Sequence, residues 1–292
     1  MLTRAVLIIA LPALFLTSCE TFNAEIEPPA YIFIEDFTID NAGVDAKWQI
    51  KSSKISDVWL YVDESQFKGA YELPATIPIA EQGRHSISLR AGIKDAGIAT
   101  KRAIYPFYME YQIDNFNLIP NHLDTMKPVT KYDFVSGTIV DAWFEDFESL
   151  FSSWENNPAS DTVLQYVSDS TKVFDGSYSG GIFLGKNDLF YELNSTPPLY
   201  DLPKNGTPTY LELNYRCNHE FIVGLYANFK SEQIPIYTVK ERAEWNKIYL
   251  NLTDYLSQNN DAYNFSVFIG VSRDVSEGDV EIYLDNIKLI HY

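Results

Sequence analysis

The chain has 292 residues, of which 46% are hydrophobic and 15% aromatic, and it carries a formal net charge of −18. This composition suffices for packed cores and argues against intrinsic disorder, and the many tyrosines and phenylalanines favour strands over helices. So acidic a surface repels phosphate backbones and anionic membranes, which argues against nucleic acid as a partner. The acidic excess suits solubility, calcium binding or a cationic partner instead.

The first 19 residues have the features of an export signal. Arg4 supplies one positive charge, and an apolar run of 12 residues follows over 5–16. Because a membrane-spanning helix needs roughly 20 residues, residues 1–18 are predicted to be a secretory signal peptide. Leu16-Thr17-Ser18-Cys19 resembles the lipobox of bacterial lipoproteins. The resemblance implies that Cys19 is acylated, becomes the mature N-terminus and anchors the protein to a membrane; the alternative is an ordinary signal with a chance cysteine.

Residues 19–30 are expected to form a lipidated tether. They carry three acidic residues and the adjacent Pro28 and Pro29, and they offer little that could pack. Some surface-exposed lipoproteins of the Bacteroidota carry acidic residues directly after the lipidated cysteine, and Glu20 and Glu25 resemble a sparse form of that signal. The sequence therefore leaves both the cell surface and the periplasmic leaflet of the outer membrane open.

The second cysteine, Cys217, is predicted to be a core residue. With Cys19 lipidated, no partner remains for an internal disulfide. Cys217 continues the apolar alternation of Leu211, Leu213 and Tyr215, as a buried thiol would.

Residues 31–115 are predicted to form an immunoglobulin-like β-sandwich. Period-two alternation runs through 31–39, 58–62 and 85–90, and turn residues such as Pro74 and Gly83 fall between these segments. Short strands that recur about every ten residues are typical of an all-β sandwich. Residues 116–138 hold two prolines but no sustained alternation, so we expect a linker there.

Two resemblances bear on this first domain. Six residues here occupy the places of a characteristic hairpin and turn: Val62, Asp63, Gly69, Pro78, Gly83 and His85. In this the segment resembles the PEGA-type and other immunoglobulin-like modules of bacterial envelope proteins. The sequence of the segments 58–63, 71–78, 89–94 and 105–108 resembles that of an uncharacterised group of Bacteroidota lipoproteins. That group carries no known activity, so the resemblance implies only architecture and a lipid-anchored place in the outer membrane.

Residues 139–292 are predicted to form a second, jelly-roll β-sandwich. Alternating segments recur over 173–184, 210–216, 221–229, 244–252, 264–271 and 280–290. In this order, the early Phe144-Glu145, the Asp-Gly-x-x-Ser-Gly of 175–180, Trp245 and the final Asp-Asn-Ile of 285–287 resemble the jelly rolls of galactose-binding-like and carbohydrate-binding modules. The resemblance implies a recognition module, on a fold that serves many roles.

Such modules often hold one structural calcium between their first and last strands. Because calcium takes several oxygen ligands, clustered carboxylates are needed, and we expect Glu145 or Glu148, together with Asp285, to supply them with help from backbone carbonyls. Strand alternation puts Glu145 and Glu148 on opposite faces, so not all three can bind one ion. The alternative is that Asp285 caps a turn or pairs with a base.

Three strands are expected to present a polar face with a hollow in it. In two of them glycines alternate with aromatic and amide side chains, in the sets Ile222, Gly224, Tyr226 and Asn228, and Ser266, Phe268 and Gly270. In the third, the side chains that face away from the apolar ones are Tyr210, Glu212, Asn214 and Arg216. A sugar needs a flat ring to stack on and planar hydrogen-bonding groups at its edge. We therefore expect Asn214, Arg216, Tyr226 and Asn228 to line a glycan site. The alternative is that this face packs on the other domain or on a loop.

The sequence contains no motif that indicates catalysis. Its four histidines have none of the spacings of a zinc site. Glu145 and Glu148 lack the spacer of the Glu-x-Asp-x-x-Glu strand motif of one jelly-roll glycosidase family. We therefore expect a non-catalytic protein that binds a glycan or envelope polymer at the cell surface. The first alternative is a structural or accessory subunit of an outer-membrane protein complex, and the second is a glycoside hydrolase.

Overall fold

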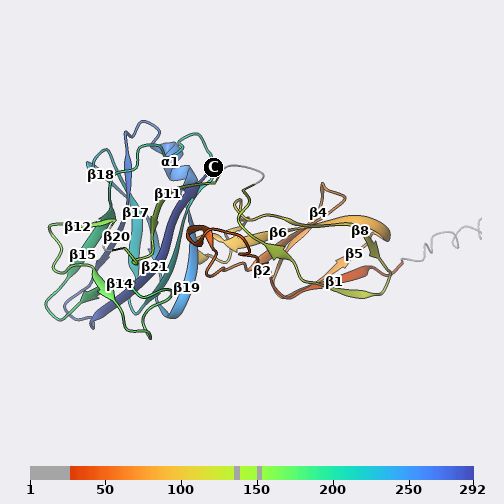
Figure 1. Cartoon of the computed structure of the whole chain (residues 1–292), viewed down its shortest axis with the longest axis horizontal. Helices are drawn as coiled ribbons and strands as arrows, with labels where there is room; N and C mark the ends of the chain where they lie inside the picture. Colours follow the sequence, from red (N-terminus) through yellow and green to blue (C-terminus); the bar gives the residue numbers. More distant parts are fainter. Residues whose placement is uncertain (1–26, 135–138, 150–152) are drawn as a thin grey trace, which may run out of the picture.

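The computed structural model describes residues 27–134, 139–149 and 153–292, which form two β-sandwiches placed end to end (Figure 1). Strands make up most of this part of the chain, and its one α-helix is the short α1 (Thr253–Gln258). The predicted all-β class is confirmed. The predicted signal peptide and Cys19 lie outside the described residues. None of the helices in these ranges has the length and apolar character to cross a membrane.

The first sandwich has two main sheets and a small ribbon. The larger sheet has the order β4-β3-β6-β7, with β8 pairing the first half of β6: β3 (Asp57–Val62), β4 (Gln66–Glu72), β6 (Gly83–Lys94), β7 (Arg102–Ile104) and β8 (Tyr111–Leu118). The smaller sheet has the order β5-β1-β9: β1 (Ala30–Ile34), β5 (Ala75–Ile79) and β9 (Leu123–Met126). The ribbon joins β2 (Thr38–Ile39) to β10 (Val129–Thr130). Because alternate side chains share one face of a strand, Ile32, Leu60 and Leu89 meet between the sheets and are fully buried.

The predicted linker over 116–138 is wrong for most of its length. It holds the end of β8 and the whole of β9 and β10, and β9 pairs in parallel with β1. Pro120 and Pro128 lie in the turns before and after β9, so they separate strands rather than domains. The first sandwich continues at least to Asp133, whose amide donates to the Phe107 carbonyl at 2.9 Å. Local alternation missed these strands because they are short and depend on partners far away in the sequence.

The second sandwich is a jelly roll of two antiparallel sheets. The six-stranded sheet has the order β13-β14-β21-β16-β19, with β11 also pairing β21: β11 (Val140–Glu145), β13 (Gln165–Val167), β14 (Ser179–Leu184), β16 (Thr209–Cys217), β19 (Arg242–Asn251) and β21 (Val280–His291). The five-stranded sheet has the order β12-β15-β20-β17-β18: β12 (Trp154–Asn156), β15 (Phe190–Ser195), β17 (Phe221–Ala227), β18 (Glu232–Val239) and β20 (Phe265–Ser272).

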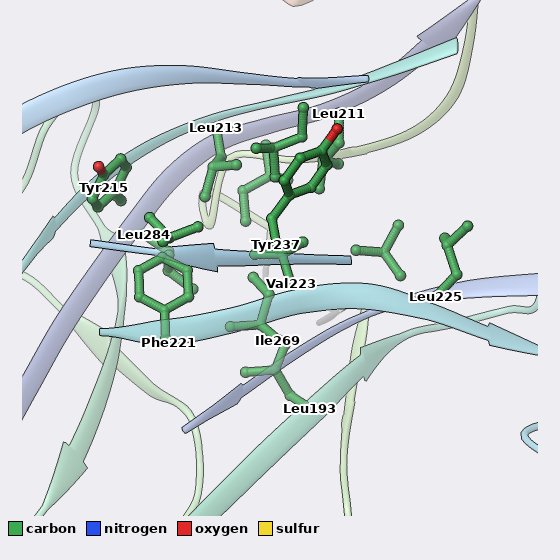
Figure 2. Close-up of a cluster of buried hydrophobic side chains, with 14 of the residues drawn as sticks. Leu193, Leu211, Leu213, Tyr215, Phe221, Val223, Leu225, Tyr237, Ile269 and Leu284 are labelled. Atoms are coloured by element: carbon green, nitrogen blue, oxygen red, sulfur yellow. The ribbon is translucent and has the colours of Figure 1, made fainter. Parts of the chain in front are cut away.

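The apolar faces of these two sheets meet in one core (Figure 2). The six-stranded sheet contributes Leu211, Leu213 and Leu284, and the five-stranded sheet contributes Val223 and Ile269 among others. Cys217 belongs to the same core, and burial raises the pKa of its thiol. Its predicted place as a core residue is confirmed.

The first sandwich covers the outer face of the six-stranded sheet. Tyr105, which is fully buried, lies at the centre of this junction, with its ring 5.3 Å from that of Tyr210 and 4.7 Å from that of Tyr249. The C-terminus also lies here (Figure 1), where the Tyr292 hydroxyl donates to the Pro106 carbonyl. The junction is therefore a continuous aromatic layer between the two sandwiches.

A buried carboxylate, Glu212 of β16, lies inside this layer. The hydroxyls of Tyr105 and Tyr132 donate to its Oε1, the latter at 2.9 Å, and Lys247 Nζ lies 2.6 Å from its Oε2. Burial opposes ionisation, but the nearby Lys247 and Lys288 outweigh it and hold the pKa of Glu212 below its ordinary value. An ionised carboxylate thus ties both sandwiches together.

Further bonds pin the sandwiches at separate points of the junction. Asn214 Nδ2 donates to Ser52 Oγ at 2.7 Å, and the Asn251 amide donates to Asp95 Oδ1 at 3.0 Å. The Tyr108 and Tyr249 hydroxyls lie 2.9 Å apart. Because these contacts come from different strands and loops, they fix the orientation of one sandwich relative to the other.

Candidate ligand-binding site

The outer face of the five-stranded sheet is not covered by the first sandwich. A hollow of about 440 Å³, called the groove below, lies across β15, β20, β17 and β18. Its floor is formed by outward-facing side chains of these strands, and the loop at 157–159 and the turn at 219–220 form its sides. Its main floor residues are Glu192, Ile222, Tyr226, Gln233, Phe268 and Gly270.

Two glycines shape the floor of the groove. A Cβ on Gly224 would lie 2.4 Å from Cε1 of Phe268, so the glycine lets that ring lie flat on β17. Tyr226 packs against the same ring, with the centroids 5.1 Å apart. A Cβ on Gly270 would first meet Glu192 Oε2, at 3.4 Å, so this glycine keeps open the space beside that carboxylate.

Glu192 is the central polar residue of the groove. Its Oε1 accepts hydrogen bonds from Asn157 Nδ2 at 2.7 Å and from the Tyr226 hydroxyl at 2.5 Å, and its Oε2 accepts one from Gln233 Nε2 at 2.6 Å. The residue is only 4% exposed, yet no Lys, Arg or His forms a salt bridge with it in the described ranges. Neutral donors alone therefore hold this carboxylate, which distinguishes it from Glu212.

The groove combines apolar surface with hydrogen-bonding groups. Ile222 is 39% exposed and Tyr226 is half-buried, so both offer apolar surface to a ligand. Burial and the hydrogen bond to Glu192 raise the pKa of Tyr226, so its hydroxyl keeps its proton and remains a donor. A carboxylate has about four lone-pair sites, and Glu192 uses three of them for the hydrogen bonds described above. The groove lies directly above this carboxylate.

An exposed aromatic cluster lies beyond the end of β17. Tyr200, Phe229 and Tyr263 are 48%, 62% and 63% exposed, and their ring centroids lie 5.6 to 6.3 Å apart. Phe229 has a φ of 56°, a left-handed conformation that costs energy for a bulky residue. Its amide donates to Asn264 Oδ1 at 2.8 Å, a bond that holds the turn in this conformation.

Of the four residues predicted to bind a ligand, only Tyr226 lies in the groove. Asn228 lies in the turn after β17, where its Oδ1 accepts the Tyr263 amide at 2.8 Å, so it positions the aromatic cluster. Asn214 and Arg216 belong to β16 in the other sheet, and their assignment to the same site is wrong. Asn214 faces the first sandwich, and Arg216 Nη1 donates to the Thr171 carbonyl at 3.1 Å.

The three carboxylates predicted to hold calcium each accept hydrogen bonds in the structure. Glu145 Oε1 accepts the Phe147 amide at 2.8 Å, and its Oε2 accepts the Ser153 hydroxyl at 2.5 Å. Glu148 Oε1 accepts two backbone amides of the turn at 177–178. Within the described residues, no three His, Cys, Asp or Glu side chains gather as a metal site would need. Each of the three carboxylates accepts hydrogen bonds from a nearby loop or turn, and the calcium site predicted from one glutamate, Asp285 and backbone carbonyls stays a prediction.

Asp285 accepts the Asp175 amide of the turn before β14 at 3.3 Å, which fits the alternative that it caps a turn. Its Oδ1 accepts the Asn286 amide at 2.7 Å, and its Oδ2 accepts the Ser179 hydroxyl at 2.5 Å. Burial raises the pKa of Asp285 to about 7, although these bonds favour the ionised form. Asp285 therefore fastens β21 to the neighbouring strand β14.

Sequence reasoning missed Glu192, Gln233 and Asn157. The alternation of Tyr191 and Leu193 with Glu192 is a strand signal, and Tyr191 and Leu193 indeed lie in the core. Asn157 lies in a loop, and Gln233 is the second residue of a strand interrupted by a proline, so neither had a local signal. The pairings of β15 with β20, of β20 with β17 and of β17 with β18 bring Glu192, Tyr226 and Gln233 together.

No protein-family model and no curated protein matches the chain. It is similar in structure to the carbohydrate-binding module TmCBM61, solved with β-1,4-galactotriose, at a TM-score of 0.34, 13% identity, and coverage of 49% of this chain and 90% of the other. It is also similar to the family 11 carbohydrate-binding module of Clostridium thermocellum, solved with a mixed-linked tetrasaccharide, at a TM-score of 0.34, 11% identity, and coverage of 50% and 92%.

A third similar structure is an enzyme. The arabinose-bound α-L-arabinofuranosidase MgGH51 matches at a TM-score of 0.33 and 14% identity, with coverage of 50% of this chain and 25% of the other. All these TM-scores lie below 0.5, so the likeness carries no inference about a ligand. From its own strands, the chain is an all-β protein of two sandwiches, the second of them a jelly roll.

Proposed function

We propose that this chain is a non-catalytic, lipid-anchored glycan-binding protein of the outer membrane, with the groove as its binding site. Glu192 carries the proposal, because a buried carboxylate held only by neutral donors lies directly beneath an open hollow. Its free lone pair would accept a hydrogen bond from a sugar hydroxyl. Ile222 and Tyr226 would offer apolar surface to the sugar ring.

The contacts of the acidic residues in the groove support binding without catalysis. Glycoside hydrolysis uses two carboxyl groups that face each other across the cleft. The groove lining contains Glu192 and Glu220, and the latter is ion-paired with Lys240. Glu192 is held by its three donors in the floor. Glu192 and Glu220 therefore do not form a pair in which one acts as an unbonded general acid and the other faces it as a nucleophile.

A glycan array tests the binding site. The chain from Glu20 to Tyr292 would be compared with its Tyr226→Ala variant, and the hits quantified by calorimetry. We expect a specific hit whose affinity falls at least tenfold in Tyr226→Ala, or about 1.4 kcal/mol. Tyr178→Ala is the matched control, since Tyr178 is 42% exposed and lies outside the groove. Equal losses in both variants, or a blank array from folded protein, would contradict the proposal.

The lipid anchor is tested separately through Cys19. The full chain, expressed in a bacterium that exports lipoproteins, is expected in the membrane fraction, with Cys19→Ser shifted to the soluble fraction. In an anchored protein the first sandwich would hold the jelly roll away from the membrane, because the described chain starts at the end farthest from the jelly roll (Figure 1). An unchanged distribution of the Cys19→Ser variant would contradict lipidation and leave the glycan test unaffected.

Docking on an outer-membrane protein complex is a second candidate, and the aromatic cluster favours it. Three exposed rings that lie together, one of them on a strained turn, are typical of an interaction surface. This function predicts that Phe229→Ala with Tyr263→Ala abolishes co-purification of a membrane protein after cross-linking, whereas Tyr226→Ala leaves it intact. A glycan hit lost in Tyr226→Ala, without any co-purified protein, would instead favour the first function.

A further inference from the structure

A second hollow, of about 630 Å³, lies where the first sandwich meets β18 and β19 of the jelly roll. The first sandwich contributes the segment after β6, including the short 3-10 turn η2 (Asp95–Gly97). The jelly roll contributes residues of β18 and β19, of which Thr238 and Arg242 are exposed. We call this hollow the cationic cleft, after the charged residues that line it: Lys54, Lys94, Lys101, Lys240, Arg242 and Lys247.

The charge of the cationic cleft is opposite to that of the chain. The whole sequence has 22 Lys and Arg residues against 40 Asp and Glu residues, yet the cleft lining has six of the former and none of the latter. A concave site lined by one sign of charge focuses the electric field and attracts ions of the opposite sign. The lining of this cleft therefore favours anions, in a chain whose net charge is negative.

Three of these cations are free of ion pairs. Lys94, Lys240 and Lys247 pair with Glu72, Glu220 and Glu212 respectively. Lys54, Lys101 and Arg242 are exposed, and none of them has a carboxylate within 4 Å in the described part of the chain. Their positive charges are available to a ligand.

The walls of the cationic cleft are fixed before any ligand arrives. The Tyr237 hydroxyl donates to the Asn251 carbonyl at 2.9 Å and lies 3.3 Å from Asp95 Oδ1, which in turn accepts the Asn251 amide. Burial raises the pKa of Asp95, which lies behind this wall. A preformed site loses little conformational entropy when a ligand binds.

Rings and apolar side chains lie among the cations. Tyr215 and Tyr237 line the cleft but are buried, so the half-buried Tyr255 and Ile236 and the exposed Ile98 supply its apolar surface. Lys101 Nζ lies 5.9 Å from the centre of the Tyr237 ring, so a cation lies beside the edge of this surface. Such a mixture suits a ligand with both an apolar ring face and acidic substituents, rather than a small inorganic anion.

We propose that the cationic cleft binds an acidic saccharide, one that carries carboxylate or sulfate groups, at a site separate from the groove. Arg242 would form paired hydrogen bonds with an acid group, as the guanidinium geometry favours. Lys54 and Lys101 lie on the first sandwich and Arg242 on the jelly roll, so the ligand would bridge both. The inference depends on the cleft alone and does not require the groove to bind anything.

The test is calorimetry with two defined probes, a hexamer of galacturonic acid and a chondroitin sulfate hexasaccharide, on the chain from Glu20 to Tyr292. We expect at least one probe to bind, with an affinity that falls as salt rises from 50 to 500 mM. A triple variant, Lys54→Gln, Lys101→Gln and Arg242→Gln, is expected to lose at least tenfold in affinity with an unchanged melting temperature. The Tyr226→Ala variant should bind both probes as the parent does.

A charge-matched control separates the cleft from net charge. The control carries Lys127→Gln, Lys186→Gln and Arg84→Gln, which also remove three exposed cations, all outside the cleft. We expect its affinity to change by less than twofold. An equal loss in the control, a loss in Tyr226→Ala, or no binding of either probe would overturn the proposal. Tighter binding of hexaglutamate than of both saccharides would also overturn it, in favour of an acidic peptide.

Discussion

The two outer faces of the jelly roll each hold a buried glutamate, but in different surroundings. Glu212 lies on the six-stranded sheet under the first sandwich, with a lysine and two tyrosine hydroxyls around it. Glu192 lies on the five-stranded sheet under an open groove, with two amides and one tyrosine hydroxyl around it. The buried cation makes the first a permanent structural charge, whereas the second still has hydrogen-bonding capacity for a ligand.

This difference shows how one fold separates assembly from recognition. On the covered face, the Glu212 carboxylate and the Asn214 amide nitrogen find their partners within the chain, so their interactions contribute to folding and to the orientation of the sandwiches. On the open face, part of the hydrogen-bonding capacity is left to the outside, and glycines keep the space for it. Variants of the two faces should therefore change different quantities: stability for the covered face and affinity for the open face.

The largest expected effect is that of Glu212→Ala. The variant leaves Lys247, whose side chain is 6% exposed, as a buried charge without its partner, and it removes the acceptor of two tyrosine hydroxyls. Breaking a buried ion pair in this way costs about 3–5 kcal/mol. We expect a loss of this size in the free energy of unfolding, measured from urea denaturation of the chain from Glu20 to Tyr292.

Glu244→Ala is the control for that measurement. Glu244 lies on β19 near Lys247 in sequence but is exposed, so its removal should change the free energy of unfolding by about 0.5 kcal/mol or less. A loss below about 1 kcal/mol for Glu212→Ala would show that the charge pair does not hold the covered face. It would also remove the contrast with Glu192.

We expect a smaller effect from Asp285, on the pH dependence of the free energy of unfolding. It lies on the same outer face as Glu212, but its pKa is raised to about 7 from a value near 3.8 in the unfolded chain. The folded state therefore binds the proton more tightly, so the contribution of Asp285 is present below pH 4 and is lost as the pH rises toward 7. Between pH 5 and pH 7 the loss should be about 2 kcal/mol, at about 1.4 kcal/mol per pH unit.

Denaturation of the parent and of Asp285→Asn at pH 5 and pH 7 measures this contribution. All other titrating groups are common to both proteins, so the difference between their pH slopes isolates Asp285. For Glu212 we expect the opposite pH dependence of the free energy of unfolding, at lower pH. Because its pKa is lowered in the folded state, Glu212 stabilises the fold above about pH 4.5, and this stabilisation is lost on acidification. Identical slopes in the two proteins between pH 5 and pH 7 would refute the assignment.

Much of the fold could be predicted from strand alternation, because a period of two determines which side chains share a face. It correctly placed Val223, Leu225 and Ile269 in the core and Tyr226 on the opposite side. It could not show which sheet a strand joins, since that depends on pairing between distant segments. Asn214 and Tyr226 were therefore assigned to one site although they lie on different sheets.

Local sequence patterns also could not predict that the first sandwich covers the outer face of the six-stranded sheet. The outward side of β16 alternates as the outward side of β17 does, yet only the former lies under the first sandwich. The sequence did pose packing on the other domain as the alternative, and for Asn214 this alternative is the correct one. Which face stays open depends on the Tyr105 and Tyr132 contacts, and these arise from a domain more than 70 residues away in sequence.

The smallest expected effects compare the two glycines of the open face. Gly224→Ala would place a methyl group 2.3 Å from the Ile234 carbonyl oxygen, so β17 and β18 must move apart. Such overpacking costs about 1–3 kcal/mol of stability. Gly270→Ala would meet nothing closer than Glu192 Oε2 at 3.4 Å, so the free energy of unfolding should change by less than about 1 kcal/mol.

The Gly270 methyl group would nevertheless occupy the space beside Glu192, which is where a ligand hydroxyl must come. We expect a two- to fivefold loss of affinity for the best array hit, or about 0.4–1 kcal/mol. Calorimetric titration at constant pH would measure it, with urea denaturation of the same preparation as the check on folding. A stable Gly270→Ala protein with parental affinity would show that the ligand does not approach Glu192, and the open face would then differ from the covered one only in lacking a partner.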